Sequence, residues 1–175
     1  MNFEEAIKPL TELLLSNSFS IQLNQQNLIA YSSKSTTLRI AHSHLEHCFN
    51  IWVGQSSDTL TELRSKVVEE FFNDDTFKFQ TTLNVENLIS FLKGSGKTLL
   101  SGDTKILREL NEYSLQASRN YTQQIIKRQN IDQADKAWTQ KDYVDFVKYI
   151  DQIQTDLLPP SYLKKYKIAV DNLNK

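Results

Sequence analysis

The string GSGKT at residues 94–98 has the residue types of a phosphate-binding loop, in which glycines precede a lysine and a threonine. That loop also requires a glycine five positions before the glycine next to the lysine, and Phe91 occupies this position. It further requires a buried strand in front, whereas residues 84–92, NVENLISFL, repeat their apolar residues at helical spacing. The string therefore does not predict a nucleotide site.

The same string is better explained as a helix end. Gly94 fits the left-handed residue that terminates a helix, and Gly96 fits the turn beyond it. Asp103, or alternatively Ser101, fits the cap of the following helix. We therefore expect residues 91–103 to join two helices, and Lys97 to have no catalytic role.

Histidines form the second group with chemical potential, because His42, His44 and His47 fall within six residues and precede Cys48. On a strand, His42 and His44 share a face, and such a pair can hold a metal ion. The alternative is that these histidines are exposed polar residues at a turn. No other His or Cys is present to complete a ligand set, so the sequence favours no metal and no cofactor, with His42 and His44 as the weak candidates.

Nucleophilic catalysis has little support, since the chain has no G-x-S-x-G elbow. Cys48 and the histidine beside it would point to opposite faces of a strand. We therefore nominate no catalytic residue and expect a protein that is not an enzyme. The acidic residues are instead candidates for partner binding, or they only keep a helix end soluble. They are Glu62, Glu69, Glu70, Asp74 and Asp75.

Composition limits the class of protein. The 175 residues are 39% hydrophobic and 23% charged, which is typical of a soluble globular chain. No long apolar run indicates a membrane helix, and the N-terminus has no early basic cluster of a secretory signal. A single cysteine favours the cytoplasm. The expected partners include neither a membrane nor a nucleic acid, and the oligomeric state is left open.

The apolar spacing predicts an α+β fold with an N-terminal helix and a four-stranded antiparallel β-meander. The helix starts with Asn2 as its cap, or nearer Pro9. In the first strand Phe19, Ile21 and Leu23 should share a face, and in the last Phe49, Ile51 and Val53 alternate with polar neighbours. The strands are expected at residues 19–23, 28–33, 36–43 and 44–54.

A mostly helical C-terminal half should follow the meander. A second helix is expected over residues 58–72, capped by Asp58 or Thr59, and a short strand at Phe77–Phe79. Further helices are expected over residues 84–93, 103–129 (as one helix or two), 132–138 and 142–153, with a last one from Ser161. We expect a single domain, 1–175, with a sheet subdomain at 1–80 and a helical one at 81–175.

Two features of the C-terminal half have competing interpretations. Aromatic and basic residues alternate there, which suits either helix packing or a nucleic-acid surface, and interspersed aspartates favour packing. Residues 134–151, ADKAWTQKDYVDFVKYID, are similar to the helix–turn–helix of tetratricopeptide repeats. Because no second copy exists, this similarity predicts only an antiparallel helical hairpin.

Charge is distributed unevenly. Residues 1–90 hold six Lys or Arg and eleven Asp or Glu, a net charge of −5, and residues 91–175 hold fourteen and ten, a net charge of +4. Such polarity could orient a partner, although interspersed charges also simply solvate a surface.

In size, in its Asn/Gln/Ser/Lys-rich composition and in its helix–meander–helices order, the chain resembles the immunity proteins of bacterial polymorphic and contact-dependent toxin systems. The resemblance implies tight binding that blocks a cognate toxin domain, with the acidic residues facing a basic toxin such as a nuclease. The alternatives are a helical adaptor for a peptide or client protein, and a metal-dependent enzyme that uses the His42–His47 strand.

Overall fold

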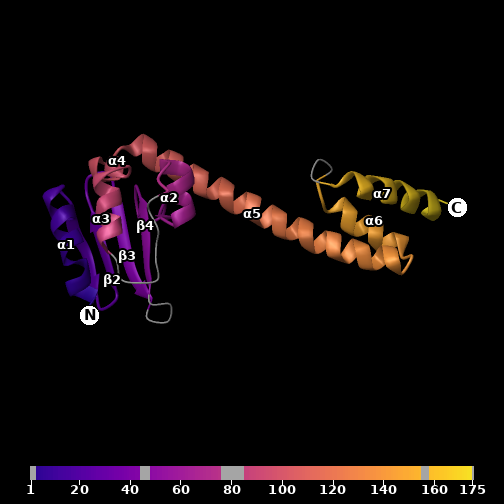
Figure 1. Cartoon of the computed structure of the whole chain (residues 1–175), viewed down its shortest axis with the longest axis horizontal. Coiled ribbons are helices and arrows are strands. Elements are labelled where there is room, and N and C mark those ends of the chain that lie inside the picture. Colours follow the sequence, from indigo (N-terminus) through magenta and orange to yellow (C-terminus); the bar gives the residue numbers. More distant parts are fainter. Residues whose placement is uncertain (1–2, 44–47, 76–84, 155–157, 175) are drawn as a thin grey trace. The chain divides into compact units, whose positions relative to one another are not determined.

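The structure is a computed structural model that describes residues 3–43, 48–75, 85–154 and 158–174 (Figure 1). It has the predicted α+β organisation, with an N-terminal helix, an antiparallel sheet and a mostly helical second half. The chain forms two compact units, unit 1 at residues 1–115 and unit 2 at residues 116–175. No helix in the described ranges has the length and apolar run needed to cross a bilayer.

Unit 1 contains a five-stranded antiparallel sheet whose strands follow one another in chain order. The strands are β1 (Ser20–Gln25), β2 (Leu28–Ser32), β3 (Thr37–Ser43), β4 (Cys48–Gly54) and β5 (Thr61–Glu62). Phe49, Ile51 and Val53 of β4 are buried and alternate with half-buried neighbours, as expected. The meander is confirmed, and β5 adds a fifth strand to the predicted four.

Helices cover one face of this sheet. They are α1 (Phe3–Ser16), α2 (Ser65–Phe72), α3 (Val85–Lys93), α4 (Lys97–Ser101) and the first turns of α5 (Thr104–Thr139). Leu10 of α1, Leu92 of α3 and Leu110 of α5 belong to one buried cluster. The same cluster contains Leu38 of β3 and Val53 of β4, which lie opposite each other in the sheet. Burying this cluster is the main stabilising contribution in unit 1, because a meander alone leaves its apolar face in water.

The helix expected over residues 58–72 begins later than predicted, at Ser65. Thr61 and Glu62 pair with β4 instead, and the Leu63 N–H donates to the Ile51 carbonyl at 2.8 Å. Pairing with β4 satisfies these backbone groups, so tertiary contact overrides the helical spacing.

Three smaller expectations concern the ends and edges of elements. α1 runs through Pro9 and starts at Phe3, so the start nearer Pro9 is wrong. In β1 the register shifts between Ile21 and Leu23, and Ile21 is exposed, which corrects the expected common apolar face. Asn2 and the expected strand at 77–79 lie outside the described residues.

α5 is one helix of 36 residues, so residues 132–138 continue the long helix and do not form a separate one. No glycine or proline occurs between residues 103 and 158 to interrupt it. It ends where Lys141 takes a left-handed conformation, with φ 59°. Asp142 then caps α6 (Tyr143–Asp151) by accepting from the Asp145 N–H at 3.0 Å, which confirms the predicted hairpin turn.

Unit 2 consists of the remaining part of α5, α6 and α7 (Pro160–Leu173). Its core combines Ala134 and Ala137 of α5 with Phe146 and Ile150 of α6 and Ala169 of α7. The small alanine side chains allow the larger α6 residues to fill the space between helices.

The boundary between the units lies at 115/116, whereas the sequence placed a subdomain boundary at 80/81. Residues 85–115 belong to unit 1 because α3, α4 and the start of α5 contribute to the core under the sheet. That the whole chain is a single domain stays a prediction.

Candidate partner-binding site

The five acidic residues nominated above, here called the acidic set, all lie in one stretch of unit 1. Glu62 is on β5, Glu69 and Glu70 are on α2, and Asp74 and Asp75 follow that helix. α2 forms because its apolar side chains, among them Val68, face the core and leave both glutamates on the opposite side. The helix ends at Asn73, whose left-handed backbone (φ 54°) redirects the chain.

Three members of the acidic set are held by other residues of unit 1. Glu62 accepts from both Nε and Nη2 of Arg64, at 2.7 and 2.6 Å. Asp74 accepts from the Ser95 hydroxyl at 2.5 Å, a contact that ties the end of α2 to the connection between α3 and α4.

Glu70 joins α2 to α5. It lies 3.6 Å from Lys66 and accepts a hydrogen bond from the Tyr113 hydroxyl. This hydrogen bond, followed by burial and the negative charge of Glu70, raises the pKa of Tyr113 to about 12. The phenol therefore stays protonated throughout the physiological range, and Glu70 has a structural role here.

Glu69 and Asp75 are exposed and make no ion pair or side-chain hydrogen bond within the described part of the chain. Their charges face water on a unit that is itself acidic. Unit 1 carries ten Lys or Arg and fourteen Asp or Glu, a net −4, while unit 2 carries ten and seven, a net +3. Glu69 and Asp75 are thus the members of the set whose carboxylates are not already bonded to another described residue.

Among the described residues, no three His, Cys, Asp or Glu side chains gather as a metal site would require, and of the three histidines only His42 is among them. His42 faces the core side of the sheet and lies against Phe3 and Phe49, with ring centroids 6.4 and 5.7 Å apart. Its ring therefore packs with aromatic residues at the edge of the core. His44 and His47 lie outside the described residues.

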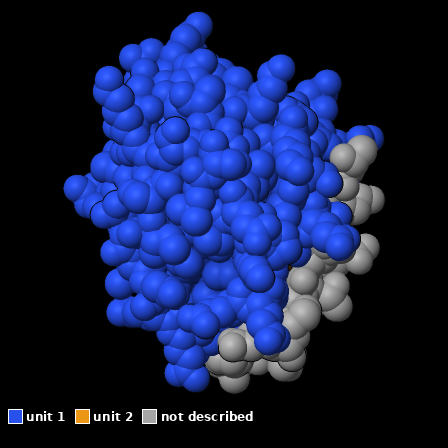
Figure 2. All heavy atoms as spheres, turned by 90° about the vertical axis from the view of Figure 1, so that its left-hand side faces the viewer, with its two compact units in different colours: residues 1–115 blue, residues 116–175 orange. Residues whose placement is uncertain are grey.

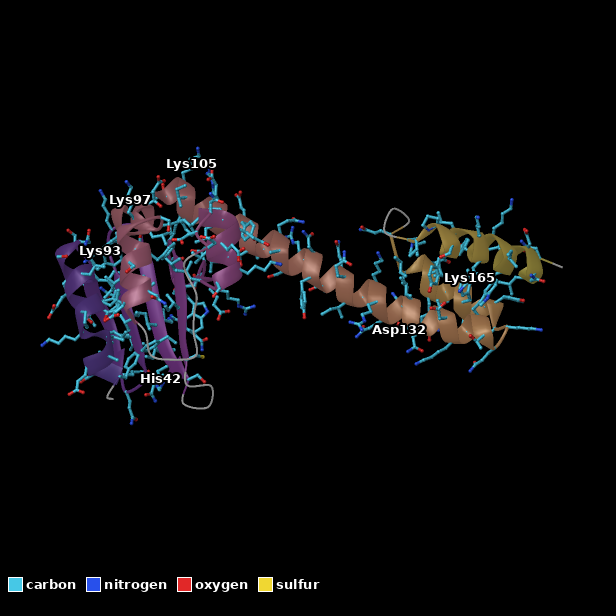
Figure 3. All side chains as sticks on the ribbon, in the orientation of Figure 1. His42, Lys93, Lys97, Lys105, Asp132 and Lys165 are labelled. Carbon is cyan, nitrogen blue, oxygen red and sulfur yellow. The ribbon has the colours of Figure 1, made fainter. Side chains whose placement is uncertain are left out.

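The GSGKT string follows a helix, as expected, but its Lys97 and Thr98 begin α4, a short helix that was not expected between residues 93 and 103. α3 precedes the string, where a phosphate-binding loop would need a strand. The Gly96 N–H donates to the Phe91 carbonyl at 2.9 Å and so does not point at a phosphate site. Lys97 begins the short α4 and is exposed. Figure 3 shows Lys97 with Lys93 and Lys105 at the end of unit 1 opposite His42.

One detail of this segment corrects the sequence analysis. The glycine in the left-handed region is Gly102 (φ 71°), which ends α4, and not Gly94. Gly102 also lies against the β2–β3 turn, where the Ser35 hydroxyl donates to its carbonyl at 2.9 Å. Asp103 caps α5 as predicted, accepting from the N–H groups of Lys105 and Ile106 at 3.0 and 3.2 Å.

Phe146 and Lys165 of unit 2 pack against Trp138. Trp138 contacts the Phe146 ring at a centroid distance of 5.0 Å, and Lys165 lies 5.5 Å from the Trp138 ring. Lys165 and the Tyr162 hydroxyl both donate to Asp135, at 3.1 and 2.6 Å, and so tie α7 to α5.

These contacts shift the pKa values of Asp135 and Tyr162 in unit 2. Burial raises the pKa of Asp135, but the hydrogen bonds from Tyr162 and Lys165 and the charge of Lys165 together bring it below its ordinary value. Burial, the same hydrogen bond and the charges of Asp135 and Asp132 raise the pKa of Tyr162 to about 12.

Sequence reasoning missed the contacts that hold the acidic set, Tyr113 with Glu70 and Ser95 with Asp74. Their residues are 43 and 21 positions apart, and no local pattern signals such pairs.

In the space-filling view of unit 1 from the side of α1, the described surface has no deep hollow (Figure 2).

Comparison with known protein families, with curated proteins and with solved structures finds no significant match to this chain.

Proposed function

We propose that the chain is a non-catalytic protein-binding protein, an immunity protein that binds and neutralises a cognate bacterial toxin. The observation that carries the proposal is the pair Glu69 and Asp75, exposed and without a neutralising partner in the described residues. They lie on a unit of net charge −4. A basic toxin domain is the partner that such a surface attracts.

The long helix supports a protein-binding role independently. Residues 115–126 of α5 are all exposed and include Leu115, Tyr121, Ile125 and Ile126, each at least 40% exposed. Large apolar side chains gathered in water on one helix are typical of surfaces that contact another protein. Tyr121, Ile125 and Ile126 belong to unit 2, so they are a candidate contact surface separate from the acidic residues of unit 1.

The test is co-expression of the chain with the product of the gene that neighbours its own. Wild-type chain is expected to protect cells and to bind the toxin domain. Glu69→Lys with Asp75→Lys is expected to weaken binding about tenfold or more at low salt, with a smaller difference at high salt. The matched control, Glu4→Lys with Glu12→Lys, changes the same charge at two exposed positions of α1 and is expected to bind nearly as well as wild type.

Two results would contradict the proposal. If the chain neither protects from nor binds the neighbouring product, the immunity role is wrong. If Glu4→Lys with Glu12→Lys weakens binding as much as Glu69→Lys with Asp75→Lys, only net charge matters. The assignment to Glu69 and Asp75 is then wrong.

A further inference from the structure

Residues 116–128 of α5, in unit 2, form a helical stretch with two different sides. At about 3.6 residues per turn, one side carries only amide side chains and one lysine. These are Gln116, Asn120, Gln123, Gln124 and Lys127. The other side, here called the α5 stripe, carries small and apolar residues. They are Ala117, Ser118, Tyr121, Thr122, Ile125 and Ile126.

The α5 stripe is open to water in the part of the chain that the structure describes. Tyr121 is 69% exposed, Ile125 40% and Ile126 45%, and every residue from 115 to 126 is exposed. A helix solvated on all sides is usually stabilised by i,i+4 ion pairs, but those found in the described part of α5 lie at residues 105–112. An apolar stripe without such support is typical of a helix face that packs against another helix.

Positive charge borders the α5 stripe. Arg119 follows Ile126 around the helix on one side, and Arg128 lies about two turns after Tyr121 on the other. Both arginines are exposed, and neither makes an ion pair or side-chain hydrogen bond with another described residue. No Asp or Glu occurs between residues 113 and 131, so with Lys127 this stretch carries a charge of +3. A partner therefore meets apolar surface flanked by cations that have no counter-charge nearby in the sequence.

We propose that the α5 stripe binds an acidic amphipathic helix of a partner protein. Apolar side chains of that helix pack against Tyr121 and Ile125, and its carboxylates pair with Arg119 and Arg128. Charge complementarity selects this occupant. A second copy of the same stretch brings three more positive charges and no negative one, so self-association through the stripe is opposed.

A protein helix also fits the α5 stripe better than a nucleic acid or a membrane does. Single-stranded nucleic acids stack on aromatic side chains, whereas the stripe is mostly aliphatic or small, with Tyr121 as its one aromatic residue. Helices that lie on membranes are rich in Lys and Arg on their polar side, and here that side carries amides and a single lysine. Tyrosine and arginine are instead enriched where proteins contact each other tightly.

This partner is not the proposed toxin. The toxin domain is expected to be basic and to bind the acidic residues of unit 1, whereas the α5 stripe belongs to unit 2 and selects an acidic partner. The two proposals depend on different residues, so either one can fail while the other stands.

The experiment is a titration of labelled peptide with the full chain, followed by fluorescence anisotropy. The glutamate probe is a helix-stabilised peptide of about sixteen residues, with leucines along one face and glutamates on both sides of them. The lysine probe has lysine at each glutamate position. Wild type is expected to bind the glutamate probe about tenfold or more tightly than the lysine probe at low salt, with a smaller difference at high salt.

A charge-reversal variant tests the pairing with the arginines. Arg119→Glu with Arg128→Glu is expected to weaken binding of the glutamate probe about tenfold or more and to strengthen binding of the lysine probe. The control, Lys164→Glu with Lys167→Glu, makes the same charge change at two exposed positions of α7. It is expected to bind the glutamate probe nearly as well as wild type.

The apolar part of the α5 stripe has its own variant. Tyr121→Ala with Ile125→Ala is expected to weaken binding of the glutamate probe about tenfold. Gln123→Ala with Gln124→Ala, on the amide side of the same stretch, is expected to bind like wild type. Amide hydrogen exchange is expected to slow in residues 117–126 when the glutamate probe is added.

Several results overturn the proposal. Equal binding of the two probes would show that charge does not select the partner, and binding of neither would show that the stripe takes no such helix. Control variants that weaken binding as much as the stripe variants would remove the assignment to these residues. Tighter binding to phosphatidylserine vesicles or to a single-stranded oligonucleotide than to the glutamate probe, lost in Arg119→Glu with Arg128→Glu, would assign the surface to that ligand instead.

Discussion

Gly96→Ala is expected to destabilise unit 1 although it adds a single methyl group. A Cβ at this position would lie 2.5, 2.6 and 2.9 Å from three ring carbons of Phe91. That ring cannot easily retreat, because Phe91 is 3% exposed and meets the Phe72 ring edge-on at a centroid distance of 5.1 Å. The methyl group therefore forces a buried aromatic out of its place in the core.

Overpacking of this kind lowers the free energy of unfolding by roughly 1–3 kcal/mol. Gly94→Ala is the matched control, since a Cβ there has its nearest neighbour, the Ser90 carbonyl oxygen, at 3.2 Å and meets no ring. It is expected to cost less than about 1 kcal/mol. Phe91→Leu removes the obstructing ring, so adding Gly96→Ala to it should cost about 1 kcal/mol less than in wild type.

Chemical denaturation followed by fluorescence can measure these changes in the free energy of unfolding, because each unit has one tryptophan. Trp52 is in unit 1 and Trp138 is in unit 2. In a Trp138→Phe background, fluorescence reports unit 1 alone. Equal costs for Gly96→Ala and Gly94→Ala would refute the reasoning, as would strict additivity with Phe91→Leu. Lys97→Ala is expected to leave both stability and partner binding unchanged.

Two further predictions concern unit 2, both followed through Trp138 fluorescence in a Trp52→Phe background. The folded-state pKa of Asp135 is lowered, so its contribution is present above the ordinary value of 3.8 and is lost as pH falls through the lower folded-state pKa. Asp135→Asn should flatten the acid unfolding curve, and Asp132→Asn should not; identical curves would contradict this. Phe146→Ala, at a fully buried position, should cost roughly 3–5 kcal/mol, whereas Tyr121→Ala, 69% exposed, should stay within about 0.5 kcal/mol of wild type. A large cost at Tyr121 would mean that the exposed part of α5 is covered in solution.

The elements that could be predicted have a local cause. The alternation of Phe49, Ile51 and Val53 and the helical spacing of residues 84–93 each bury one face, so the pattern and the structure coincide. The caps at Asp103 and Asp142 are local, because each aspartate accepts from a backbone N–H two or three residues further along the chain. The absence of glycine and proline from residue 103 to 158 likewise explains the length of α5.

The errors arose where distant contacts decide the conformation. Residues 58–64 have helical spacing, yet β4 offers backbone partners that make Thr61–Glu62 a strand. The left-handed residue was expected at Gly94 from the sequence, whereas it is Gly102, whose carbonyl accepts from the distant Ser35 hydroxyl. The exposure of Ile21 to water depends on where the helical layer ends, which no local pattern encodes.

For the candidate site, the sequence by itself determined where acidic residues concentrate and that the GSGKT string is a helix connection. Composition and spacing are sufficient for both, because they are properties of neighbouring residues. Only the tertiary structure showed that Asp74 and Glu70 accept hydrogen bonds from Ser95 and Tyr113, whereas Glu62 is held by Arg64, two residues further along the chain. Hydrogen bonds between residues far apart in the chain form only once the core brings their elements together, and they distinguish Asp74 and Glu70 from Glu69 and Asp75.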